Sequence, residues 1–118
     1  MALDYLPPPP VPEESGSVSL LIDDDTGALV VLHGAIGVDV HSEVREVVAD
    51  LESDVLGAVG RPVHVLAEHV TSFGLPGVWL LLKLRRAARP ATVFVVRPAD
   101  CVRAAIAGHG IGGLTILD

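Results

Sequence analysis

The fifteen residues 63–77, VHVLAEHVTSFGLPG, join a β-rich run to the beginning of a helix. We expect a short strand at residues 62–67, where β-branched and apolar side chains predominate. Pro76 suits the first turn of a helix, because the N–H that it lacks has no hydrogen-bond acceptor there. We therefore expect a helix from residue 76 or 77 to about residue 88, with its basic residues at the end where the helix dipole is negative.

The segments before and after this stretch also alternate between strands and helices. Residues 17–22 and 28–33 are β-rich runs around a polar turn that ends in glycine, which predicts a hairpin. Residues 42–56 have apolar side chains at steps of three and four, which predicts an amphipathic helix. The order β-β-α-β-α-β-α-β predicts an α/β fold in which helices pack against a mixed β-sheet. Its last strand, helix and strand are expected at residues 92–96, 100–107 and 114–117.

Composition excludes several classes of protein. The 118 residues are 50% apolar, which suits one compact domain that buries roughly two thirds of its unfolded surface. Cys101 is the only cysteine, so an internal disulfide and a cysteine-rich zinc site are ruled out. A net charge of −7 and an aromatic content of 3% argue against nucleic acid as a partner. No apolar run reaches the roughly 20 residues that span a bilayer, and residues 1–10 do not resemble a secretion signal. We therefore expect a cytoplasmic protein without membrane insertion.

Charge and proline are unevenly distributed along the chain. Residues 1–59 contain twelve acidic residues and one basic residue, whereas residues 60–118 contain seven basic and three acidic residues. Five of the nine prolines lie in residues 1–16. Because proline lacks the N–H and has a fixed φ, we expect a disordered, extended tail there, ahead of a domain at residues 17–118. The tail is either passive or a proline-rich ligand for a partner domain.

Five groups of residues follow one another as they do in a known family. Residues 30–37, VVLHGAIG, resemble the opening motif V-V-x-L-x-G-x-L-D, with Gly37 in place of the aspartate. Residues 42–46 resemble P-x-L-R-x, and residues 63–77 fit V-V-V-D-L-S-G-V-T-F-I-D-S-S-G without a gap. The remaining matches, to the leucines and arginines of a second helix and to a closing P-x-x-x-V-R…G-L signature, are at residues 81–88 and 98–111. The chain therefore resembles STAS domains, the fold shared by bacterial anti-sigma factor antagonists and the cytoplasmic tails of sulfate transporters.

The resemblance implies a regulatory function without the usual chemistry. In the signalling members, an Asp-Ser-Ser-Gly box lies where a strand turns into the second helix, and its second serine is phosphorylated by a kinase that is also the anti-sigma factor. Those four positions are occupied here by Gly74, Leu75, Pro76 and Gly77. Pro76 has no hydroxyl, so we expect a non-enzymatic STAS-like module that is not switched at this place. Ser72, with Thr71 beside it, is the alternative phosphoacceptor, although both residues also suit a hydrogen-bonded turn.

The same resemblance predicts where a protein partner binds. The partner is expected to be an anti-sigma factor or serine kinase, and the process to be regulation of transcription in a bacterium. The expected contact region is the loop of residues 71–77 with the start of the second helix, and residues 37–41 form its neighbouring edge. A homodimer remains open. The predicted partner-binding residues are Gly37, Asp39, His41, Thr71, Ser72, Gly74, Leu75, Pro76, Gly77, Val78 and Trp79.

The second helix has apolar side chains around its whole circumference. At 100° per residue, residues 78–84 surround the helix axis, so a helix with one face on a sheet would still expose apolar surface. Trp79, with Arg86 on the same side, is a candidate interface anchor, since Trp and Arg are enriched among residues that dominate binding energies. The alternative is that neighbouring elements bury most of this helix.

No catalytic or metal-binding pattern stands out. The five histidines form no i, i+4 pair on a helix and no HExxH motif, so we expect neither a metal site nor a cofactor. Two other functions remain open. One is a STAS-type regulatory or scaffold subunit of a larger complex, such as a transporter accessory or signalling assembly. The other is a small-ligand or nucleotide sensor, which the basic, acid-free residues 69–99 favour.

Overall fold

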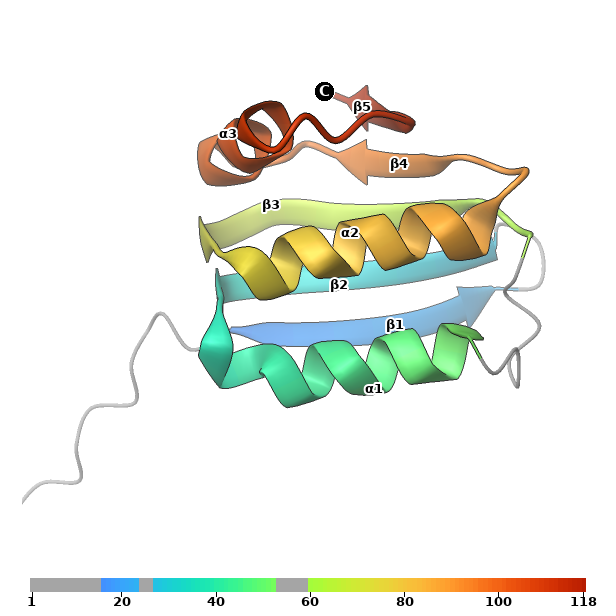
Figure 1. Cartoon of the computed structure of the whole chain (residues 1–118), viewed down its shortest axis with the longest axis horizontal. Helices are drawn as coiled ribbons and strands as arrows, with labels where there is room; N and C mark the ends of the chain where they lie inside the picture. The colour runs from blue at the N-terminus through green and yellow to red at the C-terminus, as the bar shows by residue number, and fades with distance from the viewer. Residues whose placement is uncertain (1–15, 24–26, 53–59) are drawn as a thin grey trace, which may run out of the picture.

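Residues 16–23, 27–52 and 60–118 are described by the computed structural model, and Figure 1 shows their arrangement. All the expected strands and helices are present in the expected order, so the α/β fold is confirmed. In chain order, the elements are β1 (Ser17–Asp23), β2 (Gly27–Ile36), η2 (Val38–Val40), α1 (His41–Glu52), β3 (Val63–Phe73), α2 (Leu75–Ala88), β4 (Val93–Val96), α3 (Asp100–Gly108) and β5 (Leu114–Leu117).

The five strands form one mixed sheet in the spatial order β1-β2-β3-β4-β5. β1 and β2 are the antiparallel hairpin expected from the sequence, with Asp23 opposite Gly27, and the other neighbouring pairs are parallel. A helix connects the two strands of each parallel pair. Because such crossovers are right-handed and the strand order always advances in one direction, α1 and α2 lie on the same face of the sheet. Figure 1 shows both helices in front of the strands.

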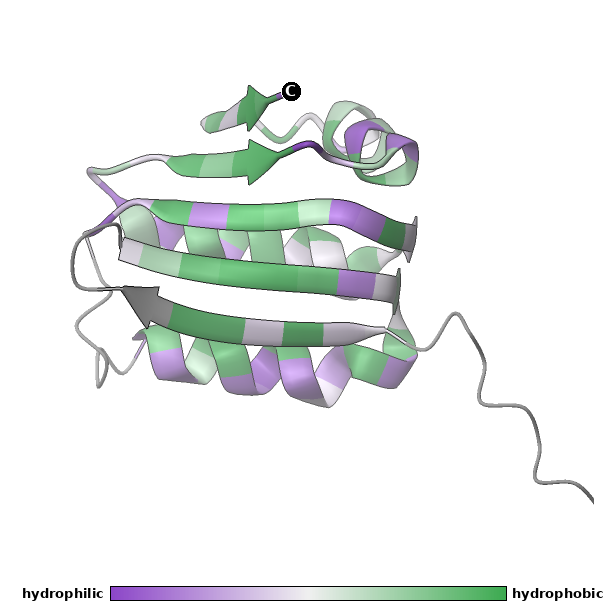
Figure 2. Cartoon of the chain, turned by 180° about the vertical axis from the view of Figure 1, so that it is seen from behind, coloured by the Kyte–Doolittle hydropathy of each residue, from purple (hydrophilic) through white to green (hydrophobic). Residues whose placement is uncertain are grey.

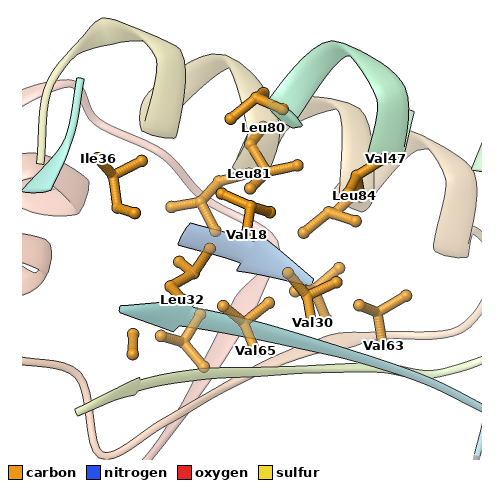
Figure 3. Packing of buried hydrophobic residues seen from close by; sticks show 14 of the residues in the cluster. Val18, Val30, Leu32, Ile36, Val47, Val63, Val65, Leu80, Leu81 and Leu84 are labelled. Carbon is orange, nitrogen blue, oxygen red and sulfur yellow. The ribbon is translucent and has the colours of Figure 1, made fainter. Parts of the chain in front are cut away.

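The core lies between this face of the sheet and the helices α1 and α2. Alternate side chains of β2 and β3 point towards the helices, and the central ones are Val30, Leu32, Val63 and Val65. The α2 side chains that pack against them are Leu80, Leu81 and Leu84 (Figure 3). Fully burying a side chain of this size contributes about 1.5–3 kcal/mol, so this layer dominates the stability of the fold.

Most of α2 is buried, as the second of the two predictions for this helix supposes. Val78 joins the leucines in the core, and Trp79 is half-buried against it. Leu82 is 37% exposed. The apolar circumference of α2 therefore serves mainly to pack the helix between the sheet and α1.

β3 runs to Phe73, whereas the sequence predicts a strand that ends at residue 67. Beyond Leu66, β3 no longer pairs with β4 and continues along β2 alone, through register shifts, as far as Phe73 opposite Ile36. This extension is exposed at many positions, so it contains polar residues and lacks the apolar pattern that identifies a strand. Residues 71–77 are consequently not the predicted loop, because Gly74 alone separates β3 from α2.

Three of the expected segments lie outside the described residues. They are residues 1–15 of the expected proline-rich tail, the centre of the hairpin turn at residues 24–26, and residues 53–56 at the expected end of the first helix. Within the described part of the chain, no helix is both long enough and apolar enough to cross a membrane.

Candidate protein-interaction surface

The carboxyl ends of β2 and β3 lie side by side, and the segments that follow them meet. The Gly74 N–H donates a hydrogen bond to the Ile36 carbonyl oxygen at 2.8 Å. A Cβ atom on Gly74 would lie 3.8 Å from the Gly37 Cα, so the two turns are close neighbours. Parallel strands bring their carboxyl ends to the same edge of a sheet, which is where ligand-binding segments of α/β folds gather. We call the surface formed by residues 37–41 and 71–79 the carboxyl-edge surface.

Two large apolar side chains of this surface are exposed to solvent. Val38 in η2 is 84% exposed, and Leu75 in the first turn of α2 is 71% exposed. No other large apolar side chain of the described residues is as exposed as these two. Exposed apolar patches commonly mark contacts with partners, so this pair makes the edge the candidate interaction surface.

The sequence predicts Leu75 at this surface but does not single out Val38. Val38 and Val40 flank Asp39 in a three-residue helix, and either valine could face the core. The structure buries Val40, at 3% exposure, and leaves Val38 in solvent. No local pattern distinguishes the two valines, because the direction of η2 depends on its packing against the rest of the fold.

Only backbone groups cap the N-terminus of α2. The Gly74 carbonyl oxygen accepts hydrogen bonds from the N–H groups of Gly77 at 3.0 Å and Val78 at 3.2 Å, and no side chain caps the helix. Pro76 lies in the first turn, as expected, and is half-buried. Gly77 and Val78 are buried, and a Cβ atom on Gly77 would come within 2.5 Å of the Phe73 ring. Gly77 and Val78 therefore support the carboxyl-edge surface from inside and present no side chain to a partner.

Thr71 and Ser72 lie in β3 and not in a turn, and both are exposed. The expectation of two hydrogen-bonded turn residues is wrong, because β3 keeps pairing with β2, with Ser72 opposite Ala35. The Ser72 hydroxyl therefore belongs to the end of a strand. It does not lie at the helix N-terminus, where an anionic group would be favoured.

Trp79 connects the carboxyl-edge surface to the contact between α1 and α2. Its ring centroid lies 6.2 Å from that of His41, the first residue of α1. The Lys83 Nζ lies 5.6 Å from the Trp79 centroid, within the range of a cation–π interaction, and 3.5 Å from Glu52 Oε1. The cation over the ring is thus Lys83, whereas the helical spacing suggests Arg86. Trp79 is therefore the last residue of the carboxyl-edge surface and also contributes to helix packing.

Other reactive groups are dispersed or serve packing. Among residues 16–23, 27–52 and 60–118, no three His, Cys, Asp or Glu side chains lie close enough together to hold a metal ion. Cys101 is half-buried at the start of α3, with its Sγ 3.6 Å from the Val70 carbonyl oxygen. The glycine-rich connection between α3 and β5 is held by a hydrogen bond of 2.7 Å from the Arg85 guanidinium to the Gly112 carbonyl oxygen.

Comparison with known proteins identifies the fold. No protein-family model matches the sequence, and no curated protein matches it. The chain is similar to the solved structure of the anti-sigma factor antagonist SpoIIAA in its unphosphorylated form, with a TM-score of 0.67 and 18% identity, covering 86% of this chain and 88% of that one. It is also similar to the Bacillus cell fate determinant SpoIIAA in the phosphorylated form, with a TM-score of 0.65 and 18% identity, covering 86% of this chain and 92% of that one. The chain therefore has the fold of the anti-sigma factor antagonist SpoIIAA, which is the STAS-like fold that the sequence predicts.

Proposed function

We propose that the chain is a non-enzymatic regulatory protein that binds a protein partner through the carboxyl-edge surface. The observation that carries this proposal is the exposure of Val38 and Leu75 on two neighbouring turns. An aliphatic pair of this kind, at the edge of a well-buried core, suits the apolar centre of a protein–protein contact. Since the fold is that of an anti-sigma factor antagonist, an anti-sigma factor is the leading class of partner.

Polar side chains around this pair suit the rim of the same contact. Asp39 and His41 are exposed beside Val38, and Thr71 and Ser72 are exposed at the end of β3. Interfaces commonly have an apolar centre and a polar, solvent-accessible rim. Rim residues of this kind affect specificity and the rate of association more than they affect affinity.

The chemistry at the start of α2 supports a contact that is always available. SpoIIAA has been solved in phosphorylated and unphosphorylated forms. A phosphate adds about −1.5 to −2 charges to the surface that carries it. In this chain, Leu75 and Pro76 have no hydroxyl that could receive a phosphate. The affinity of the carboxyl-edge surface is therefore set by its shape and apolar area, and not by modification at this place.

The test is a quantitative affinity capture from the native cytoplasm, with four forms of the full chain as baits. We expect one protein to be retained by the wild type and to be reduced at least about tenfold with Leu75→Asp or Val38→Asp, because each variant places a charge in the apolar centre of the contact. Leu82→Asp is the matched control, since Leu82 is an exposed leucine of the same helix outside the carboxyl-edge surface.

Equal retention of every captured protein by all four baits would overturn the proposed surface. If the specific protein is a transporter or a signalling scaffold, the proposed surface stands, but the partner is a component of a larger complex and not an anti-sigma factor. If it is an anti-sigma factor, both parts of the proposal stand.

A further inference from the structure

The face of the sheet opposite α1 and α2 has a pocket of about 340 Å³ near the carboxyl ends of β2, β3 and β4. Figure 2 shows this face, which is hydrophobic along the central strands and hydrophilic near those ends. We call the hollow the sheet pocket. Its apolar side is lined by Val31, Leu66 and Val96, which are neighbours across three strands. Its polar side is lined by His33, Glu68, His69 and Arg97.

A bulge in β3 places two consecutive polar side chains at the sheet pocket. On this face Val31 lies opposite Leu66. The next pair, His33 with His69, is two residues further along β2 but three residues further along β3. The extra residue interrupts the alternation of the strand, so Glu68 and His69 both line the pocket although they are neighbours in sequence. The His33 and His69 rings lie 6.1 Å apart. Bulges of this kind re-aim side chains and are common beside functional sites.

A different irregularity, at the end of β4, places Arg97 at the same pocket. Val95 is buried in the core and Val96 lines the pocket, so regular alternation would turn residue 97 towards the helices. Arg97 instead has a φ of 44°, in the left-handed region that disfavours a residue with a side chain, and it is exposed in the lining. Within the described part of the chain, its guanidinium has no ion-pair partner. A strained arginine that neutralises no carboxylate of the fold points to a function in binding an anion.

Two unrelated irregularities of the sheet therefore add hydrogen-bond donors to one pocket with an aliphatic wall. Pockets of about 300–1,000 Å³ that combine an apolar lining with a few convergent polar groups are typical of small-molecule sites. We propose that the sheet pocket binds a small aliphatic carboxylate, with the carboxylate group at His33, His69 and Arg97 and the chain on the apolar side. This proposal does not rest on the proposed function, because no lining residue belongs to the carboxyl-edge surface.

The polar side of the pocket suits a ligand with one negative charge. A carboxylate accepts hydrogen bonds at both oxygens, and a guanidinium presents a fork of N–H donors that matches it. An imidazole donates a further hydrogen bond from a ring N–H. Arg97 is the one permanent cation in the lining, and Glu68 is the one carboxylate. A polyanion such as a nucleoside triphosphate would bring several negative charges beside Glu68, so the charge of the lining favours a monoanion.

The apolar side of the pocket suits a short aliphatic chain. Leu66 lies opposite Val31 on one side and Val96 on the other, so the three side chains form one continuous wall. Leu66 is 36% exposed, which leaves apolar surface for a ligand to cover. At about 30 Å³ for each water molecule, the pocket of about 340 Å³ has the volume of about eleven waters, which suits a ligand of about ten non-hydrogen atoms. Octanoate is a carboxylate of this size.

The test is a titration of the full, isotope-labelled chain with octanoate, followed by NMR of the backbone amides and the histidine rings. We expect saturable shifts at the amides of residues 31, 66, 69, 96 and 97 and at the His33 ring, all with one dissociation constant. The amides of α1, on the other side of the sheet, should not shift.

Three further compounds test the chemical class of the ligand. 1-Octanol has the same chain without the carboxylate and should bind at least about tenfold more weakly, because the charge-assisted hydrogen bonds are lost. Acetate has the carboxylate without most of the chain and should also bind at least about tenfold more weakly, because it covers little apolar surface. ATP should bind more weakly than octanoate, because its phosphates meet Glu68 and only one permanent cation.

Matched variants test the residues of the polar side. Arg97→Gln should weaken octanoate binding at least about tenfold, whereas Arg86→Gln, which removes the same charge from the exposed side of α2, should leave it unchanged. Glu68→Gln removes the one acidic group of the lining and should tighten binding about two- to fivefold. Unfolding cannot produce tighter binding, so Glu68→Gln separates a ligand site from an effect on stability. Unchanged amide shifts in α2 establish that each variant is folded.

Octanoate shifts that do not saturate, or that lie away from the sheet pocket, would overturn the proposal. Equal binding of octanoate and 1-octanol would also overturn it, because the carboxylate would then have no function in binding. Tighter binding of ATP than of octanoate would overturn the ligand class in favour of a nucleotide. Equal effects of Arg97→Gln and Arg86→Gln would overturn the placement of the carboxylate at Arg97.

Discussion

Gly77 shapes the candidate surface more than its lack of a side chain suggests. The Phe73 ring occupies the space where a Cβ atom on Gly77 would lie, with a closest approach of 2.5 Å. The last side chain of β3 can therefore lie over the first turn of α2, and the chain turns with Gly74 alone between strand and helix. Of the four box positions, only Gly77 matches the STAS motif, and the Phe73 ring explains why a glycine is needed there.

Pro76→Ser tests whether the start of α2 can regain a switch. Serine is accepted in the first turn of a helix, so we expect the free energy of unfolding to stay within about 1 kcal/mol of the wild type. When a captured anti-sigma factor kinase is added with ATP, intact-mass measurement should show one phosphoryl group on the variant and none on the wild type. Pro76→Ser combined with Ser72→Ala should still be modified. Stoichiometric modification of the wild-type chain at Ser72 would contradict the proposed unswitched surface.

α2 shows why an apolar circumference does not by itself indicate an interface. The helix packs against the sheet and against α1, so its buried face is broad: Leu80, Leu81 and Leu84 are fully buried within an arc of about 100°, and Val78 widens it. On the side of the helix beside Glu52, the Lys83 side chain covers the Trp79 ring and forms an ion pair with Glu52. Only Leu75 at the start and Leu82 on the outer side are left exposed. The proposed interaction surface is therefore at the end of the helix and not along it.

Two leucines of α2 provide a direct test of this packing. Leu84→Ala removes a fully buried side chain and should lower the free energy of unfolding by about 2–5 kcal/mol. Leu82→Ala, on the exposed side of the same helix, should lower it by less than about 1 kcal/mol. Urea unfolding followed by Trp79 fluorescence and by circular dichroism measures both. Equal losses would mean that α2 does not pack as described.

The molecule as a whole is asymmetric, with a well-buried centre and a weakly held carboxyl-terminal edge. β3 pairs with β2 and β4 over residues 63–66, and its inward side chains are buried. β5 pairs with β4 alone, and three of its four residues are exposed. The Arg103–Asp118 ion pair beside β5 is exposed, so it contributes little. Stability should therefore decrease from β3 towards β5.

Amide hydrogen exchange should reproduce this gradient. The amides of β3 between residues 63 and 66 are expected to exchange only through global unfolding, because they lie at the centre of the sheet over the core. The amides of β5 are expected to exchange faster, through local opening of the edge. The measurement is native-state exchange by NMR at low denaturant concentrations. If both strands exchanged at one rate set by the global free energy of unfolding, the edge would be part of the same cooperative unit.

Short-range patterns were enough to predict the elements and their order. The predictive patterns each extend over a few residues, so they can be recognised without knowing the fold. They are the β-rich run of β2, the apolar stripe of α1, Pro76 at the start of α2 and the glycine that ends the hairpin turn. The resemblance to STAS domains placed the phosphoacceptor box at residues 74–77, where this chain has no serine.

Contacts between distant parts of the chain were beyond such patterns. The extension of β3 to Phe73 depends on pairing with β2, and the exposure of Val38 depends on how η2 meets the fold. The meeting of Gly37 with Gly74 exists only once the strand register is set. The strand register is set when the sheet and the helices pack together. The preferences of short segments therefore cannot determine it. The sequence by itself therefore determined the helices and strands and their order. Only the tertiary structure decided which residues are neighbours and which are exposed to solvent, because both depend on contacts between distant parts of the chain.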